Sequence, residues 1–73
     1  MLAEKVKEGI ERKLREGCTI YISTNYKHFK ITPKSFERQV LFKIDKQGNL
    51  RYQGKIICHP NMLLVKVTVE CKN

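Results

Sequence analysis

Segment Asp45–Asn49 separates two stretches in which apolar and polar residues alternate, and it fixes how those stretches pair. The apolar positions are Val40, Phe42 and Ile44 before the segment and Leu50, Tyr52 and Ile56 after it. Gly48 fits the third position of a three-residue loop, in which a type I turn is followed by a G1 bulge. This turn predicts a hairpin in which Phe42 faces Tyr52. All the apolar side chains then share one face of the sheet, whereas a shift by one residue would divide them between two faces.

Two further alternating stretches complete the expected sheet. Apolar residues recur at every second position in residues 18–23 and again in residues 63–71, as in half-buried strands. A turn at 59–62 would pair Cys58 with Leu63 and extend the hairpin into an antiparallel meander. We therefore expect strands at about 18–23, 38–45, 50–58 and 63–71, and the position of the first strand in the sheet stays open.

Residues 2–16 have the periodicity of a helix. Leu2, Val6, Ile10 and Leu14 recur every four residues and form one narrow apolar stripe. Gly17 suits the left-handed position that follows the last turn of a helix. The predicted fold class is α+β, with this N-terminal amphipathic helix packed on one face of an antiparallel sheet of three to five strands that contains a β-meander. A chain of 73 residues supports one modest core, so we expect a single domain, 1–73.

Residues 25–36 leave two alternatives open. Phe29 and Ile31 alternate with polar residues and would extend a hairpin from the first strand, or the stretch is a loop in which Phe29 fills a gap in the core. Thr32 followed by Pro33 ends either structure. Thr32 as N-cap and Pro33 at the first helical position would begin a short helical turn near Phe36.

The charge balance is strongly basic, with 15 Lys and Arg against 7 Asp and Glu and a formal net charge of +8. Residues 17–73 carry ten of these cations and three of the anions, so the excess belongs to the predicted sheet. A basic surface favours an anionic partner. No apolar stretch approaches the ~20 residues that span a bilayer, and the N-terminus has no signal-peptide core, so we expect no membrane partner. The three Cys are odd in number and have no CxxC spacing, which favours reduced thiols and a cytoplasmic location.

The expected register places basic and polar side chains on the sheet face opposite the helix. The predicted cross-strand neighbours there are Arg51 with Glu70, Gln53 with Thr68, and Lys55 with Lys66. Like charges directly opposite each other are destabilising, so an anion between the two lysines would stabilise that pair. Aromatic residues next to cations, as in 26–30, are typical of nucleic-acid surfaces. We expect a surface for nucleic acid, either DNA or RNA, that comprises Tyr21, Lys43, Arg51, Gln53, Lys55, Lys66, Tyr26, Lys27 and Lys30.

Two other interpretations of this face stay open. Lysines on a solvated sheet also serve solubility and protect strand edges, with no ligand at all. Leu41, Ile57 and Leu64 fall on the same expected face and would form an apolar interface, covered by residues 26–36 or by a second copy. The alternative function is therefore a protein-interaction module, an inhibitor or regulator of the kind found in phages and mobile elements, that docks on an acidic partner as a monomer or a homodimer.

Catalytic and metal-binding patterns are weak, so we expect no enzyme, no metal and no cofactor. The four Gly are isolated, which excludes a Gly-rich phosphate loop. Cys58 and His59 are adjacent, but the expected hairpin places Cys58 roughly 25–30 Å from Cys71, too far for a shared zinc ion or a disulfide between them. All three Cys fall on expected core faces, where a free thiol behaves as a small apolar side chain.

Overall fold

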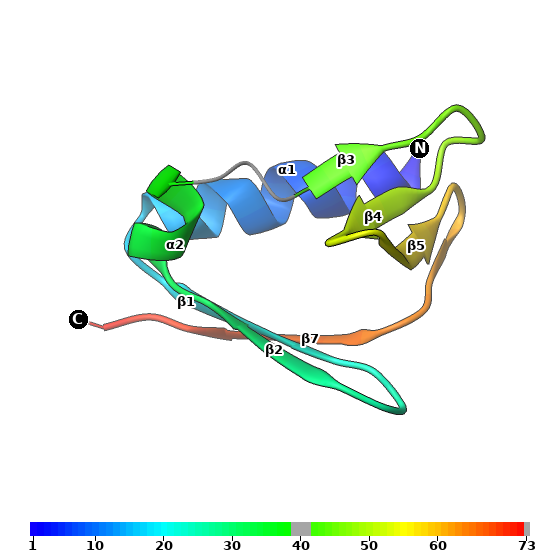
Figure 1. Ribbon diagram of the computed structural model, residues 1–73. Helices are drawn as coiled ribbons and strands as arrows, with labels where there is room; N and C mark the ends of the chain where they lie inside the picture. The colour runs from blue at the N-terminus through cyan, green and yellow to red at the C-terminus, as the bar shows by residue number, and fades with distance from the viewer. Residues whose placement is uncertain (39–41, 73) are drawn as a thin grey trace.

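The computed structural model describes residues 1–38 and 42–72, which form two helices and two small antiparallel sheets around one core (Figure 1). In chain order the elements are α1 (Leu2–Arg15), β1 (Thr19–Ser23), β2 (His28–Ile31), α2 (Pro33–Arg38), β3 (Phe42–Ile44), β4 (Leu50–Tyr52), β5 (Lys55–His59), β6 (Met62–Leu63) and β7 (Lys66–Glu70). One sheet has the strand order β2-β1-β7 and the other the order β3-β4-β5-β6. The predicted α+β class, with an N-terminal helix and a β-meander, is confirmed.

Helix α1 begins and ends as the sequence predicts. The backbone N–H of Leu2 donates to the carbonyl of Pro60 at 2.9 Å, which anchors the start of the helix on the turn between β5 and β6. At the other end Gly17 has φ +92°, and its N–H donates to the carbonyl of Leu14 while the N–H of Cys18 donates to that of Lys13. This pair of bonds is the Schellman motif, which satisfies carbonyls that the last turn leaves free.

The stretch that the sequence left ambiguous forms a hairpin and then a short helix. Strand β2 pairs with β1 in the register Ile22–Phe29 and Ile20–Ile31, so its apolar residues face the core. The hydroxyl of Thr32 accepts a hydrogen bond from the N–H of Ser35 at 3.2 Å and caps helix α2. Of the two alternatives, the hairpin is therefore the one that forms.

The meander starts with the predicted hairpin and then departs from it. Phe42 pairs with Tyr52 and Ile44 with Leu50, as predicted, and Gly48 has φ +85° in the connecting turn. The prediction of one continuous strand over 50–58 is wrong. Gln53 and Gly54 both have positive φ, 51° and 82°, and form a two-residue turn that folds β5 back onto β4.

The prediction of one strand over 63–71 is also wrong. Cys58 does pair with Leu63, as expected, but strand β6 ends there. The chain then crosses to the first sheet, where β7 pairs with β1 and not with the meander. The expected cross-strand pairs Arg51–Glu70, Gln53–Thr68 and Lys55–Lys66 therefore do not form, because the two members of each pair lie in different sheets.

Both sheets and α1 contribute to a single apolar core. Its members with less than one-tenth exposure are Ala3, Ile10, Leu14, Ile20, Ile22, Phe29, Ile31, Phe42, Leu50, Tyr52, Ile57 and Cys58. Figure 1 shows α1 and the meander on one side of the sheet β2-β1-β7, whose other side is uncovered by the described elements. The helix thus covers the apolar face of the sheets, as expected.

Cys18 and Cys71 form a disulfide, with their Cα atoms 4.2 Å apart. The expectation that all three thiols are free is therefore wrong, and Cys58 alone is free and buried among the described cysteines. The antiparallel pairing of β1 with β7 brings the two half-cystines together, because Cys18 precedes β1 and Cys71 follows β7. The cytoplasmic location, which the expected thiols favoured, stays a prediction.

Candidate nucleic-acid interface

The structure divides the nine predicted nucleic-acid residues between the two sheets. On or beside the sheet β2-β1-β7 lie Tyr21, Tyr26, Lys27, Lys30 and Lys66, and on the meander lie Lys43, Arg51, Gln53 and Lys55. The nine residues therefore do not share one sheet face, which the prediction required. The two groups have different surroundings and are described in turn.

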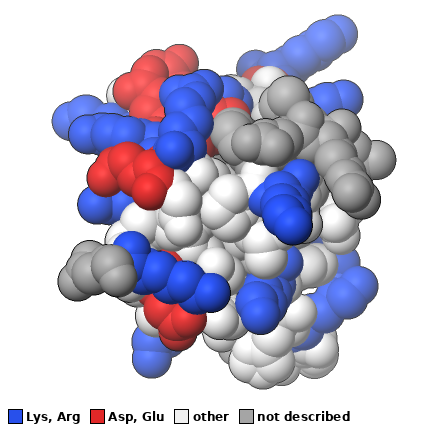
Figure 2. All heavy atoms as spheres, turned by 90° about the vertical axis from the view of Figure 1, so that its left-hand side faces the viewer, with Lys and Arg blue, Asp and Glu red and all other residues white. Residues whose placement is uncertain are grey.

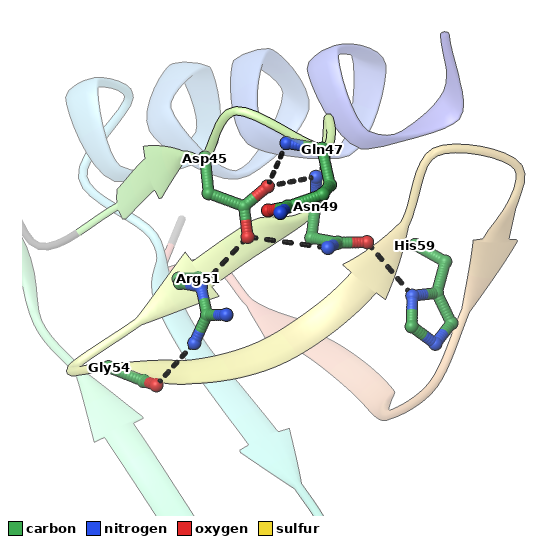
Figure 3. A network of polar contacts seen from close by, with 6 residues as sticks. All are labelled: Asp45, Gln47, Asn49, Arg51, Gly54 and His59. Atoms are coloured by element: carbon green, nitrogen blue, oxygen red, sulfur yellow. Dashed lines mark hydrogen bonds and ion pairs between the residues drawn. The ribbon is translucent and has the colours of Figure 1, made fainter.

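In the meander group, the side chain of Arg51 is 40% exposed but is engaged in two contacts within the protein. Its Nε donates to Oδ2 of Asp45 at 2.9 Å, and its Nη1 donates to the carbonyl of Gly54 at 2.9 Å (Figure 3). The guanidinium thus ties the turn between β3 and β4 to the turn between β4 and β5. Gln53 lies in the second of these turns, and Lys55 is paired in register with Tyr52. These positions are explained by the architecture of the meander.

Asp45 organises the network around Arg51. Its Oδ1 accepts the backbone N–H groups of Gln47 and Asn49, each at 2.9 Å, and its Oδ2 also accepts the side-chain amide of Asn49 at 3.3 Å (Figure 3). The backbone N–H of Asn49 and the Arg51 guanidinium stabilise the charged form and lower the pKa of Asp45 to about 2. An Asp at the start of a turn often bonds the backbone two residues on, and this signal in the sequence could have predicted the structural role.

The network extends to the turn between β5 and β6. Because Asn49 donates its amide to Asp45, its Oδ1 accepts the Nδ1–H of His59 at 2.9 Å (Figure 3). The Cys58 thiol donates to the backbone carbonyl of His59 at 3.2 Å, not to the ring. Burial raises the pKa of the Cys58 thiol. The adjacent Cys58 and His59 thus have separate hydrogen-bond partners and form no thiol–imidazole pair.

In the other group, the outer face of β2-β1-β7 brings several predicted residues together. Tyr21 lies at the centre of this face, between Lys30 of β2 and Thr68 of β7 in the cross-strand register. In the neighbouring row, Ser23 lies between His28 and Lys66. The Lys30 ammonium lies 6.0 Å from the centre of the Tyr21 ring, within cation–π range. The sequence-based expectation that Tyr21 points outward agrees with its half-exposed position opposite the buried Ile20 and Ile22.

A shallow depression of about 480 Å³ opens beside Tyr21, at the end of the sheet that adjoins α2 and the disulfide. Its lining comprises Gly17, Thr19, Tyr21, Lys30, Thr32, Pro33, Lys34, Glu70 and Lys72. Three lysines thus face one carboxylate, together with two threonine hydroxyls. Figure 2, which views the molecule from the end that carries α2 and the C-terminus, shows more Lys and Arg than Asp and Glu on this side. The depression can hold an anionic group next to an aromatic ring.

Two of these lysines were missed at the sequence level. Lys34 follows Pro33 in the first turn of α2, and Lys72 follows Cys71, so neither belongs to a regular alternating pattern. They reach the depression because β2 and β7 flank β1 and their ends meet there. Their role depends on strand order, which alternation within each strand does not specify.

At the opposite end, the β1–β2 turn carries Tyr26 and Lys27. The Thr24 hydroxyl accepts the N–H of Lys27 at 2.8 Å and the N–H of Tyr26 at 3.2 Å, which fixes the turn. Tyr26 is 95% exposed, whereas the Lys27 ammonium lies 5.3 Å from the centre of the Phe29 ring. Tyr26 is thus available for contact, but at a distance along the sheet from the depression.

The predicted apolar interface does not form as expected. Ile57 has no exposed surface and belongs to the core, because the turn at Gln53–Gly54 changes the face on which it lies. Leu41, like Val40, lies outside the described residues. Leu64 is 44% exposed and is preceded by Met62 and Leu63, which are 56% and 40% exposed. The exposed apolar run is therefore 62–64 and not the predicted set.

Among residues 1–38 and 42–72, no group of three or more His, Cys, Asp or Glu is placed to hold a metal ion. The same residues include no helix that is long and apolar enough to cross a membrane. In comparisons with known proteins, no family model, no curated protein and no solved structure matches this chain.

Proposed function

We propose that the protein binds nucleic acid through the outer face of the sheet β2-β1-β7. The observation that carries this proposal is the position of Tyr21, which lies between Lys30 and Thr68 and borders a depression that Lys34 and Lys72 also line. Aromatic rings among cations bind nucleic acids because bases stack on the ring while ammonium groups contact phosphates. No catalytic step is proposed.

The roles differ from those expected from the sequence alone. Lys30, Lys34, Lys66 and Lys72 would contact phosphates, and Tyr21 would stack on a base. Tyr26 would contact a nucleic acid that is long enough to extend from the depression to the β1–β2 turn. Arg51 has no part in the proposal, because its guanidinium binds Asp45 and Gly54. Lys43, Gln53 and Lys55 belong to the other sheet and are also left out.

The salt dependence of binding tests the phosphate contacts. If four lysines each neutralise one phosphate of a single strand, log K against log salt should have a slope of about −2.8, a roughly fifty-fold loss between 50 and 200 mM. For a duplex the corresponding slope is about −3.6. Fluorescence anisotropy with labelled single-stranded DNA, single-stranded RNA and duplex DNA would measure these slopes and identify the preferred form. A slope near zero for all three probes would contradict the proposal.

A matched pair of double variants tests the surface. Lys30→Ala/Lys66→Ala removes two charges from the proposed face and should halve the salt slope for a single strand to about −1.4. Lys43→Ala/Lys55→Ala removes the same charge from exposed positions on the other sheet and should leave most of the affinity. Equal losses in both variants would show that the overall charge, not this face, determines binding.

The role of Tyr21 needs its own comparison. Tyr21→Phe keeps the ring and should bind as the unmodified protein does, while Tyr21→Leu removes the stacking surface and should weaken binding by roughly ten-fold or more. If both variants bind equally well, Tyr21 does not stack on a base.

One observation favours a second candidate function, a protein-interaction module that docks on an acidic partner. Met62, Leu63 and Leu64 are consecutive and each at least 40% exposed, and apolar side chains dominate the energy of most protein interfaces. Under this hypothesis Leu64→Glu abolishes capture of the partner from a lysate, and nuclease treatment does not. Recovery of partners only while nucleic acid is intact would favour the first function.

A further inference from the structure

We propose that two copies of the chain pair along the free edge of β7, antiparallel and about a two-fold axis at Thr68. Within the described strands, β7 pairs with β1 on one edge and with no strand on the other. A free edge presents backbone donors and acceptors that can add a further strand. This inference does not depend on nucleic-acid binding.

The sequence of β7 is complementary to itself. It has the order Lys66-Val67-Thr68-Val69-Glu70, so a two-fold axis at Thr68 places Lys66 of one copy opposite Glu70 of the other. The same axis places Val67 opposite Val69 and Thr68 opposite Thr68. Opposite charges, β-branched pairs and Thr–Thr pairs all stabilise directly opposed positions in an antiparallel sheet. A second copy is therefore the occupant that this edge fits.

The faces of the two copies also agree. Val67 and Val69 are paired in register with the buried Ile22 and Ile20, so they lie on the core side of the sheet. Val69 nevertheless remains 42% exposed, because no described strand covers its outer flank. Opposed residues in a sheet share a face, so the two-fold pairing would place Val67 of one copy against Val69 of the other and extend the apolar layer.

The other free edge of this sheet disfavours self-pairing. An axis at Phe29 of β2 would place His28 opposite Lys30, and an axis at Lys30 would place that lysine opposite itself. Both arrangements oppose basic residues. The meander has edge strands β3 and β6 of only three and two residues. Self-complementarity therefore selects β7.

The resulting dimer would have one continuous six-stranded sheet with the order β2-β1-β7-β7-β1-β2. Its two outer faces would lie on the same side, with the two β1 strands about 14 Å apart across three interstrand spacings. A five-residue strand pair buries less area than a standard interface, so we expect dissociation constants on the order of 10–100 µM.

Sedimentation equilibrium of the full chain from about 10 µM to 1 mM, after nuclease treatment, tests the pairing. Lys66→Glu alone places two carboxylates opposite each other at each end of the strand pair. Their repulsion should raise the dissociation constant of the dimer roughly ten-fold. Glu70→Lys alone should do the same through opposed lysines. The double variant Lys66→Glu/Glu70→Lys restores complementary charges and should dimerise as the unmodified chain does.

A mixture gives the sharpest comparison. Lys66→Glu and Glu70→Lys chains are complementary to each other at both ends, so an equimolar mixture should dimerise more tightly than either variant alone. Lys55→Glu, which changes an exposed lysine of the other sheet by the same charge, is the matched control and should have no effect. Far-UV circular dichroism checks that each variant folds. We expect all of them to fold, because the side chains of Lys66 and Glu70 are exposed. A monomer throughout the range, single variants that dimerise as tightly as the unmodified chain, or a double variant that does not recover would each overturn the proposal.

Discussion

The ring of Phe29 meets the ring of Tyr52 edge-on, with 5.0 Å between their centroids and 84° between their planes. Phe29 belongs to β2 and Tyr52 to β4, so this contact joins two sheets that share no strand. Tyr52 also packs against Phe42, with 5.0 Å between centroids. Three rings thus hold the meander against the sheet that carries the proposed binding face.

Replacing Phe29 with Leu should lower the free energy of unfolding by about 1–2.5 kcal/mol, because it removes ring volume from the core and the edge-on contact with Tyr52. Urea denaturation followed by circular dichroism measures the change. Tyr26→Leu is the control, since Tyr26 is 95% exposed and its loss should change stability by no more than about 0.5 kcal/mol. Equal effects of the two substitutions would show that Phe29 does not join the sheets.

The sequence correctly predicts those parts of the fold in which local chemistry and periodicity agree. Gly17 ends α1, and the turn with Gly48 sets Phe42 opposite Tyr52. The break at Gln53–Gly54 was missed because Tyr52 and Ile56 continue the alternation across it, and Gln seldom adopts a positive φ. This one unrecognised turn moves Ile57 from the expected outer face into the core, and the register irregularity between Leu50 and Arg51 then returns Cys58 to its expected core face.

Strand order was harder to predict than strand position. The alternating residues 63–71 include the real strand β7, but alternation specifies a face and not a neighbour, so the pairing of β7 with β1 was missed. The proposed binding face changed as a result: Lys66 joins Tyr21 and Lys30, and Arg51 becomes a structural residue. The disulfide was missed for the same reason, because it depends on which strand ends meet.

Substituting Gln53 with Asn should stabilise the protein by about 0.5–1 kcal/mol. Both residues of the turn have positive φ, and Asn adopts this conformation at less cost than Gln when Gly follows. Gln53→Val tests the opposite direction, since a β-branched residue at φ 51° should destabilise the turn by at least about 1 kcal/mol. Thermal or urea unfolding of both variants measures the difference, and the prediction fails if Asn and Val have the same effect.

Loss of the disulfide should lower the free energy of unfolding by about 2–4 kcal/mol. The bond joins residues separated by 53 positions, and a closed loop of this length restricts the unfolded chain considerably. Cys71→Ala should show this loss in urea denaturation, and a reductant should lower the unmodified protein to the same level. The variant itself should not respond to the reductant, because its remaining described cysteines, Cys18 and Cys58, are then unpaired. A reductant that leaves the unmodified protein unchanged would contradict the prediction.

The carboxylate of Asp45 should make stability depend on pH in the acid range. Hydrogen bonds from the Asn49 backbone and from Arg51 lower its pKa to about 2 in the folded state, against 3.8 without them, so the unfolded chain binds the proton more readily. The stabilisation is therefore complete above about pH 5 and is lost as the pH falls through 4 toward 2. Urea denaturation between pH 2 and 7 should show this loss for the unmodified protein.

Comparison with Asp45→Asn isolates the contribution of this one carboxyl group. The variant keeps an oxygen that can accept a backbone N–H but has no charge for Arg51, so it should be less stable at pH 7 and should lose less stability on acidification. The two curves should converge near pH 2, where the native carboxyl is half protonated and its charge is disappearing. Glu4→Gln, at an exposed position on α1, removes a carboxylate outside this network and controls for the change in net charge. If the Asp45→Asn curve runs parallel to that of the unmodified protein, the network in Figure 3 does not stabilise the turn through charge.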